Sequence, residues 1–141
     1  MTQVNINAYQ EFVEAVTSVD SNETESLLYR IKNIQALADE NQTPLNVSLL
    51  MTGSIGLCTE SGEFGEYVKK MLFQGKPYNE EIRNQMIKEL GDVIWYWTNA
   101  CRAIEVDPND VIAVNVEKLR SRYTGGEFNV YESENRKPED N

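Results

Sequence analysis

Two stretches of this sequence decide its fold, and each carries two acidic residues three positions apart. The first is GLCTESGEFGEYVKK, residues 56–70, and the second is ELGDVIWYW, residues 89–97. Both lie inside longer segments, 45–73 and 79–105, whose apolar residues recur with a helical period. The pattern predicts two long helices. Because residues three apart share a helix face, each helix presents its two carboxylates together.

Helical phase separates these acid pairs from the other acidic residues of the chain. In the first long helix, Glu60 stands where the apolar stripe requires a hydrophobic residue, and Glu63 borders that stripe. In the second, Glu89 takes a stripe position and Asp92 lies on the adjoining row. The pair that begins at Glu11 lies opposite an apolar stripe, so we expect it to face solvent.

Four carboxylates turned toward one space repel one another strongly. Buried carboxylates are rare, and they are costly without a cation or a hydrogen-bonding partner. A hard cation turns such a cluster into a set of oxygen ligands. Because every candidate ligand is an oxygen, Mg²⁺, or alternatively Mn²⁺, is favoured over zinc. We predict that Glu60, Glu63, Glu89 and Asp92 bind this metal; the alternative is a purely structural acid cluster.

Composition excludes several classes of function. A net charge of −10 over 141 residues argues against nucleic acid as a partner, because tracking its backbone requires clustered Lys and Arg. Histidine is absent, which removes Ser-His-Asp and Cys-His catalysis. No apolar run approaches the roughly 18 residues of a membrane span, and residues 1–5 show no signal-peptide pattern. We predict a cytoplasmic protein without a membrane partner.

The rest of the chain predicts more helices. Three further segments show the helical period: 5–18, 23–40 and 108–123. With the two long helices they predict the all-α class, as an antiparallel bundle of four to five helices. Residues 18–22 are expected to form a loop. Residues 1–128 are predicted to be a single domain and residues 129–141 a polar tail, with a strand considered only at 128–131.

Small residues interrupt the first long helix. Four glycines lie within it: Gly53, Gly56, Gly62 and Gly65. Each costs about 1 kcal/mol relative to alanine in a helix interior, so we interpret them as places where another backbone or a ligand approaches closely. Two cysteines, Cys58 and Cys101, lie in apolar helical contexts and are expected to be buried reduced thiols.

The order of these motifs resembles that of the MazG-type all-α nucleoside triphosphate pyrophosphohydrolases. The shared features are Glu-x-x-Glu, a spacer of 25 residues, Glu-x-x-Asp, and a final helix with Asn115, Lys118 and Arg122. The resemblance covers residues 45–128. The N-terminal helices and the turn at 73–77 are similar to those of small single-unit versions from bacteriophages. Thr124 departs from the pattern, because proline is usual there, and this affects the helix end more than the chemistry.

The resemblance implies a fold, an activity and roles for further residues. It implies a MazG-like bundle, acting as a Mg²⁺-dependent enzyme that cleaves a nucleoside or deoxynucleoside triphosphate to the monophosphate and pyrophosphate. Glu60 or Glu63 would be the general base, since no histidine is available. Substrate contacts would come from five residues: Lys118, Arg122 and Asn115 at the phosphates, Lys76 at the triphosphate tail, and Tyr96 at the nucleoside. The resemblance also implies a homodimer or homotetramer, in the host cytoplasm if the chain is encoded by a bacteriophage.

Other interpretations stay open at this stage. The α-helical face with Asn115, Lys118 and Arg122 is also what an ordinary solvated helix face would show. An enzyme with the same carboxylates would hydrolyse the alarmone guanosine tetraphosphate instead of a triphosphate. A non-enzymatic alternative is an acidic helical regulatory module, which would have a charged face without a buried acid cluster.

Overall fold

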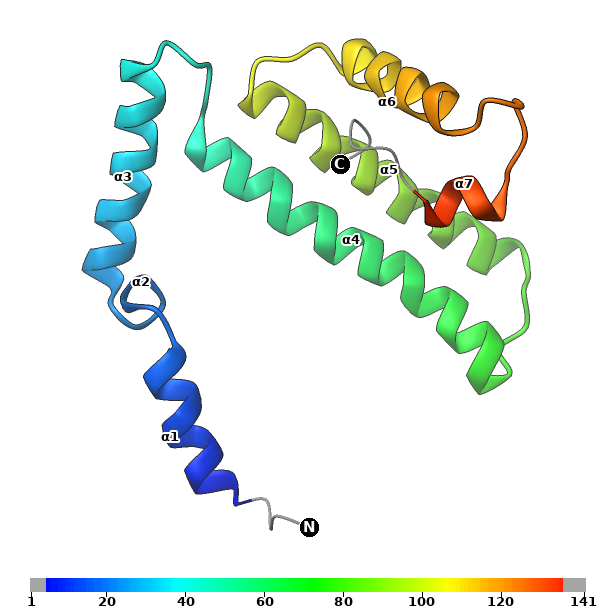
Figure 1. Ribbon diagram of the computed structural model, residues 1–141. Helices are drawn as coiled ribbons and strands as arrows, with labels where there is room; N and C mark the ends of the chain where they lie inside the picture. The colour runs from blue at the N-terminus through cyan, green and yellow to red at the C-terminus, as the bar shows by residue number, and fades with distance from the viewer. Residues whose placement is uncertain (1–4, 136–141) are drawn as a thin grey trace. The chain divides into compact units, whose positions relative to one another are not determined.

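The computed structural model describes residues 5–135, and every regular element in that range is a helix (Figure 1). The helices are α1 (Ile6–Val16), α2 (Val19–Asn22), α3 (Thr24–Glu40), α4 (Val47–Gln74), α5 (Glu80–Ala103), α6 (Pro108–Arg122) and α7 (Val130–Glu134). The all-α class predicted from the sequence is confirmed. No helix within residues 5–135 is both long enough and apolar enough to cross a membrane.

Five helices begin and end within two residues of their predicted limits, and two short ones were not predicted. Helix α2 occupies the segment expected to be a loop, and it is a single turn closed by the Glu23 amide donating to the Val19 carbonyl at 2.8 Å. Helix α7 replaces the strand considered at 128–131 and part of the expected tail. Its first turn is capped by the Asn129 side chain, which accepts from the Glu132 amide at 3.2 Å. Residues 136–141 of that tail lie outside the described range.

The chain divides into two compact units, Met1–Val47 and Ser48–Asn141. The single domain over residues 1–128 stays a prediction. In the first unit, the Asp20 carboxylate ties α2 to α3: it accepts from the Ser26 hydroxyl at 2.5 Å and from Arg30 Nε at 2.9 Å. These hydrogen bonds, from Ser26 first and then Arg30, hold the pKa of Asp20 below its ordinary value.

The second unit is built on an antiparallel pair, α4 and α5. The Gly53 position lies against the Ala100 backbone, where a Cβ would stand 2.9 Å from the Ala100 nitrogen. One turn further along α4, Gly56 lies beneath the Tyr96 ring. Because contacts that advance along α4 retreat along α5, the two helices run in opposite directions.

The four glycines of α4 therefore fall into two classes. Both Gly53 and Gly56 face α5: the interpretation of close approach by another backbone is right for Gly53, whereas Gly56 is approached by the Tyr96 side chain. No other part of the described chain approaches Gly62 or Gly65, because a Cβ at either position would meet no atom within 4 Å, so approach of a ligand stays a prediction there.

Helix α6 packs on α5 and begins as the sequence predicts. The Asp107 carboxylate caps it by accepting from the Asn109 amide at 2.7 Å, and Pro108 stands in its first turn. Such a cap contributes about 1 kcal/mol, and proline at this place loses no hydrogen bond because the first amides of a helix have no intrahelical partner.

Few of the described residues are buried. In the second unit they are Cys101, Ala103 and Asn99, together with two α4 glycines, while Val47 ends the first unit. The prediction of a buried thiol is confirmed for Cys101, which is 4% exposed, and is wrong for Cys58, which is exposed. Large apolar side chains remain exposed on most of the helices.

Candidate metal centre

The α4–α5 pair brings three carboxylates together. Glu60 and Glu63 on α4 and Glu89 on α5 each offer a carboxylate oxygen, and these oxygens all lie within 4.8 Å of one another. Glu60 and Glu89 are half-buried and Glu63 is exposed. The cluster therefore forms between the two helices, one turn of α4 beyond Gly56, over which the Tyr96 ring of α5 lies.

Glu60 is the carboxyl most affected by this crowding. Its pKa is raised above the ordinary value, first by partial burial and then by repulsion from neighbouring carboxylates. Those neighbours are Glu63, Asp92 and Glu89, in order of decreasing effect. The contribution of Asp92, which is itself exposed, places the fourth predicted carboxylate near Glu60 as well.

Glu66 shows how an ordinary surface acid on the same helix differs. It lies one turn beyond Glu63, and it forms ion pairs with Lys69 and with Lys70, the latter at 3.4 Å. These cations, Lys69 first, hold the pKa of Glu66 below its ordinary value. The pKa of Glu60 is raised and that of Glu66 is lowered. This difference distinguishes a cluster of mutually repelling carboxylates from an acid that is paired with surface lysines.

The donor set of the cluster suits a hard divalent cation. Carboxylate oxygens are the ligands that Mg²⁺ and Mn²⁺ prefer, and Mg²⁺ holds its ligands at about 2.1 Å, so that opposite ligands lie about 4.2 Å apart. Oxygens within 4.8 Å of one another reach this spacing through small rotations of flexible glutamate side chains. The residues present therefore fit such a metal.

Tyr96 lies next to the cluster. A Cβ on Gly56 would overlap its ring, so the ring lies directly over the glycine, one turn of α4 before Glu60. The Trp95 ring meets Tyr96 edge to face, with ring centroids 4.8 Å apart. Gly56 thus leaves the space that the Tyr96 ring occupies, one turn of α4 before Glu60, a role that sequence reasoning had not assigned to it.

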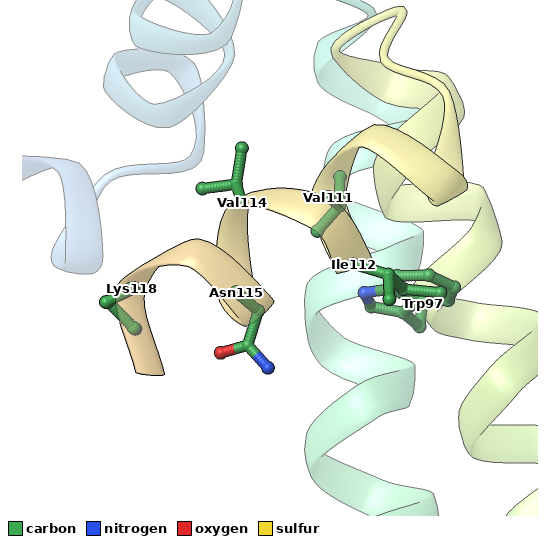
Figure 2. Close-up of a pocket in the computed structure, with 6 residues that line it drawn as sticks. All are labelled: Trp97, Val111, Ile112, Val114, Asn115 and Lys118. Atoms are coloured by element: carbon green, nitrogen blue, oxygen red, sulfur yellow. The ribbon is translucent and has the colours of Figure 1, made fainter. Parts of the chain in front are cut away.

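Asn115 and Lys118 lie elsewhere in the unit, on α6. They line a hollow of roughly 400 Å³ together with Trp97, Val111, Ile112 and Val114. Figure 2 shows Ile112 against the Trp97 indole, with Asn115 and Lys118 on successive turns of α6. None of the four carboxylates lines this hollow. Within residues 5–135 the hollow is therefore separate from the carboxylate cluster.

The two remaining predicted substrate residues occupy helix ends. Arg122 is half-buried in the last turn of α6. Lys76 is exposed after α4, and its amide donates to the Lys70 carbonyl at 3.2 Å, next to Gly75, whose φ of 67° closes the helix. Sequence reasoning did not identify the hollow beside Trp97; the apolar pair Val111 and Ile112, which also lines it, was the available signal.

Comparison with known proteins assigns the family of these helices. Residues 52–125 match the model of the MazG nucleotide pyrophosphohydrolase domain. "Gene 37 protein" of Mycobacterium phage L5 is 35% identical over 74 residues, which are 52% of this chain and 65% of that protein, so the match spans just under two thirds of its relative's length. No solved structure matches the chain. The matched region contains the complete carboxylate cluster and all of α6, and the chain belongs to the MazG family.

Proposed function

We propose that this protein is a nucleoside triphosphate pyrophosphohydrolase that uses Mg²⁺, or Mn²⁺, to release a monophosphate and pyrophosphate. The observation that carries the proposal is the meeting of Glu60, Glu63 and Glu89 within 4.8 Å, inside the region that matches the MazG domain. Ribose and deoxyribose nucleotides are both within the proposal. The bacteriophage relative supports the cytoplasm of a host cell as the place of action.

The four carboxylates would hold the metal. Glu60, Glu63 and Glu89 supply the oxygens already gathered, and Asp92 lies near enough to Glu60 to raise its pKa. When bound, the metal supplies positive charge that neutralises phosphate oxygens and lowers the pKa of a water molecule. Glu60 or Glu63 would accept the proton of the water that replaces pyrophosphate at the α-phosphorus.

Other residues would bind and orient the nucleotide. Lys118, Arg122 and Asn115 share a face of α6, so their donors would converge on phosphate oxygens, and Lys76 would meet the tail of the triphosphate. Tyr96, held over Gly56, would pack against the nucleoside.

The proposed assembly is a homodimer or homotetramer. Support comes from α5, where Ile87, Leu90 and Ile94 form an apolar stripe that is between 47% and 61% exposed. An exposed stripe of this kind marks an interaction surface more often than a solvated face.

A nucleotide panel with product identification tests the activity. The purified chain is incubated with the common NTPs and dNTPs and with guanosine tetraphosphate, in Mg²⁺, in Mn²⁺ and in excess chelator. We expect monophosphate and pyrophosphate in equal amounts from at least one triphosphate, and no product with chelator. Release of diphosphate and orthophosphate, or turnover of the tetraphosphate alone, would contradict the proposal.

Thermal unfolding tests the metal separately from turnover. Folding raises the pKa of Glu60, so ionised Glu60 destabilises the fold, and this destabilisation grows as the pH rises through that pKa. We therefore expect Glu60→Gln to raise Tm in chelator, and to remove the further rise that Mn²⁺ or Mg²⁺ gives the unsubstituted protein. The matched variant Glu66→Gln, which breaks ion pairs, should keep the metal-dependent rise. An equal rise in all three proteins would place the metal elsewhere.

A further inference from the structure

Helix α1 has an apolar face that its own unit leaves uncovered. Five large apolar side chains of this helix are between 39% and 69% exposed: Ile6, Tyr9, Phe12, Val13 and Val16. They recur at helical spacing, so they form one continuous stripe along α1. Amphipathic helices of this kind typically lay such a stripe into a hydrophobic groove.

The charge around this stripe specifies the kind of groove it fits. Residues 5–29 contain five acidic side chains and no Lys or Arg, and two of the acids, Glu11 and Glu14, lie on α1 itself. An anionic surface would repel this segment, and pairing two α1 helices would place like charges near each other. A groove that carries a cation is the complementary partner.

A groove of that description lies along the second half of α6. It encloses roughly 290 Å³, and its apolar walls are Val116, Leu119, Tyr123 and Phe128. Arg120 lines it and is its cation, while Glu127 also contributes to the lining. Residues 116–128 as a whole carry three basic and two acidic side chains in a chain whose net charge is −10.

Arg120 is available for a new partner. Its ion pair with Glu117 has an N–O distance of 3.4 Å, and both side chains are 74% exposed. Pairs of this kind contribute about 0–1 kcal/mol, so exchanging Glu117 for another carboxylate costs little. Arg120 also lies outside the proposed substrate face of α6, which consists of Asn115, Lys118 and Arg122, so the groove is separable from the proposed active site.

We propose that α1 of one copy of this chain docks in the α6 groove of a second copy, with Phe12 in the apolar part and Glu11 and Glu14 beside Arg120. A cavity of this size accommodates an aromatic side chain and part of its neighbours. Docking would cover the two apolar surfaces at once and would pair the acidic helix with the cation of the groove.

The first unit leaves the apolar face of α1 without a cover of its own. In that unit α1 continues away from the N-terminal end of α3 and does not fold back along it (Figure 1). Helix α3 has 17 residues and therefore spans about 25 Å. Because α1 lies at the end of α3 opposite the connection at residues 41–46, its apolar stripe is left open to a partner, and the proposed homodimer or homotetramer supplies a second copy as that partner.

A charge-swap experiment on the full chain tests the proposal. One variant carries Glu11→Lys and Glu14→Lys, and the other carries Arg120→Glu. Each alone places like charges together at every α1–groove contact, whereas an equimolar mixture restores complementary charges in mixed pairs. The readouts are the dissociation constant from sedimentation equilibrium and the hydrogen–deuterium exchange of amides 6–16, which reports α1 itself even if another interface holds the copies together.

We expect each variant alone to weaken association about tenfold or more and to lose protection of α1. The mixture should regain both. The variant with all three substitutions in one chain should also regain both, which controls for damage to folding, and the charge-matched variant with Glu25→Lys and Glu40→Lys on α3 should behave as the unsubstituted protein. Unchanged α1 exchange in the single variants would overturn the proposal, and so would a mixture that stays unprotected while the triple substitution is protected, because α1 would then dock on its own chain.

Discussion

Replacing Glu60 by Gln is expected to reduce pyrophosphate release by about 10²–10⁴-fold, the range that general acid–base groups contribute. The substitution keeps the shape of the side chain and removes one negative charge from a cluster whose oxygens lie within 4.8 Å. Partial burial and then repulsion from neighbouring carboxylates raise the pKa of Glu60 and so oppose its charge; removing that charge should leave the fold intact while metal binding and proton transfer are lost. Steady-state kinetics with saturating Mg²⁺ measures the loss, and circular dichroism checks the helix content.

The matched control for this result is Glu66→Gln. Glu66 is on the same helix, one turn from Glu63, and its charge is already neutralised by Lys69 and Lys70. We expect its turnover number to stay within about threefold of the unsubstituted protein, because surface pairs of this kind contribute little. Equal losses in the Glu60 and Glu66 variants would mean that negative charge along α4, and not the cluster, supports activity.

Replacing Gly53 by Ala is expected to lower the free energy of unfolding by about 1–3 kcal/mol, the usual cost of overpacking. The new methyl group would stand 2.9–3.0 Å from backbone atoms and Cβ of Ala100, and backbone cannot rotate aside as a side chain can. The better helix propensity of alanine offsets at most about 1 kcal/mol of this cost. Chemical denaturation followed by circular dichroism measures the difference.

Gly65→Ala provides the comparison within the same helix. No atom lies within 4 Å of its would-be Cβ, so alanine should stabilise α4 by about 0.5–1 kcal/mol. Opposite signs for two identical substitutions in one helix would confirm that α5 lies against Gly53. A stabilising Gly53→Ala would contradict the α4–α5 packing on which the carboxylate cluster depends.

The periodicity of apolar residues was sufficient to predict the long helices but not the short ones. The segments that became α4 and α5 have more than six helical turns each, so apolar spacing determined their ends to within two residues. Helix α2 has four residues and α7 has five, too few for any period to show. Both depend on local hydrogen bonds, such as the Asn129 cap, which a hydrophobic pattern does not record.

The candidate site, too, was predicted from the sequence only in part. Phase within a helix identified Glu60 and Glu89 as acids in apolar stripes, and packing of the two stripes brings them together. Sequence spacing could not say which glycines face α5, because that depends on the rotation of α4 about its axis. Nor could it say that Lys118 lines a hollow beside Trp97, since this depends on the angle at which α6 crosses α5.

The exposure of Cys58 also depends on which face of α4 is turned toward α5. An apolar context predicts burial, but a helix in a thin layer buries only one face, and Cys58 lies on the face of α4 turned away from α5. The exposed apolar residues of α1 and α5 follow from the same shortage of covering surface, which copies of the chain are proposed to supply.

The carboxylate cluster is proposed above all as a metal centre, and Mn²⁺ binding measured by electron paramagnetic resonance tests this role directly. Mn²⁺ takes the same oxygen ligands as Mg²⁺ and its free-ion signal reports occupancy without turnover. We predict saturable binding by the unsubstituted chain and by Glu66→Gln, and loss of that binding in Glu60→Gln and in Glu89→Gln. Binding of equal strength in all four proteins, or none in the unsubstituted chain, would contradict the account.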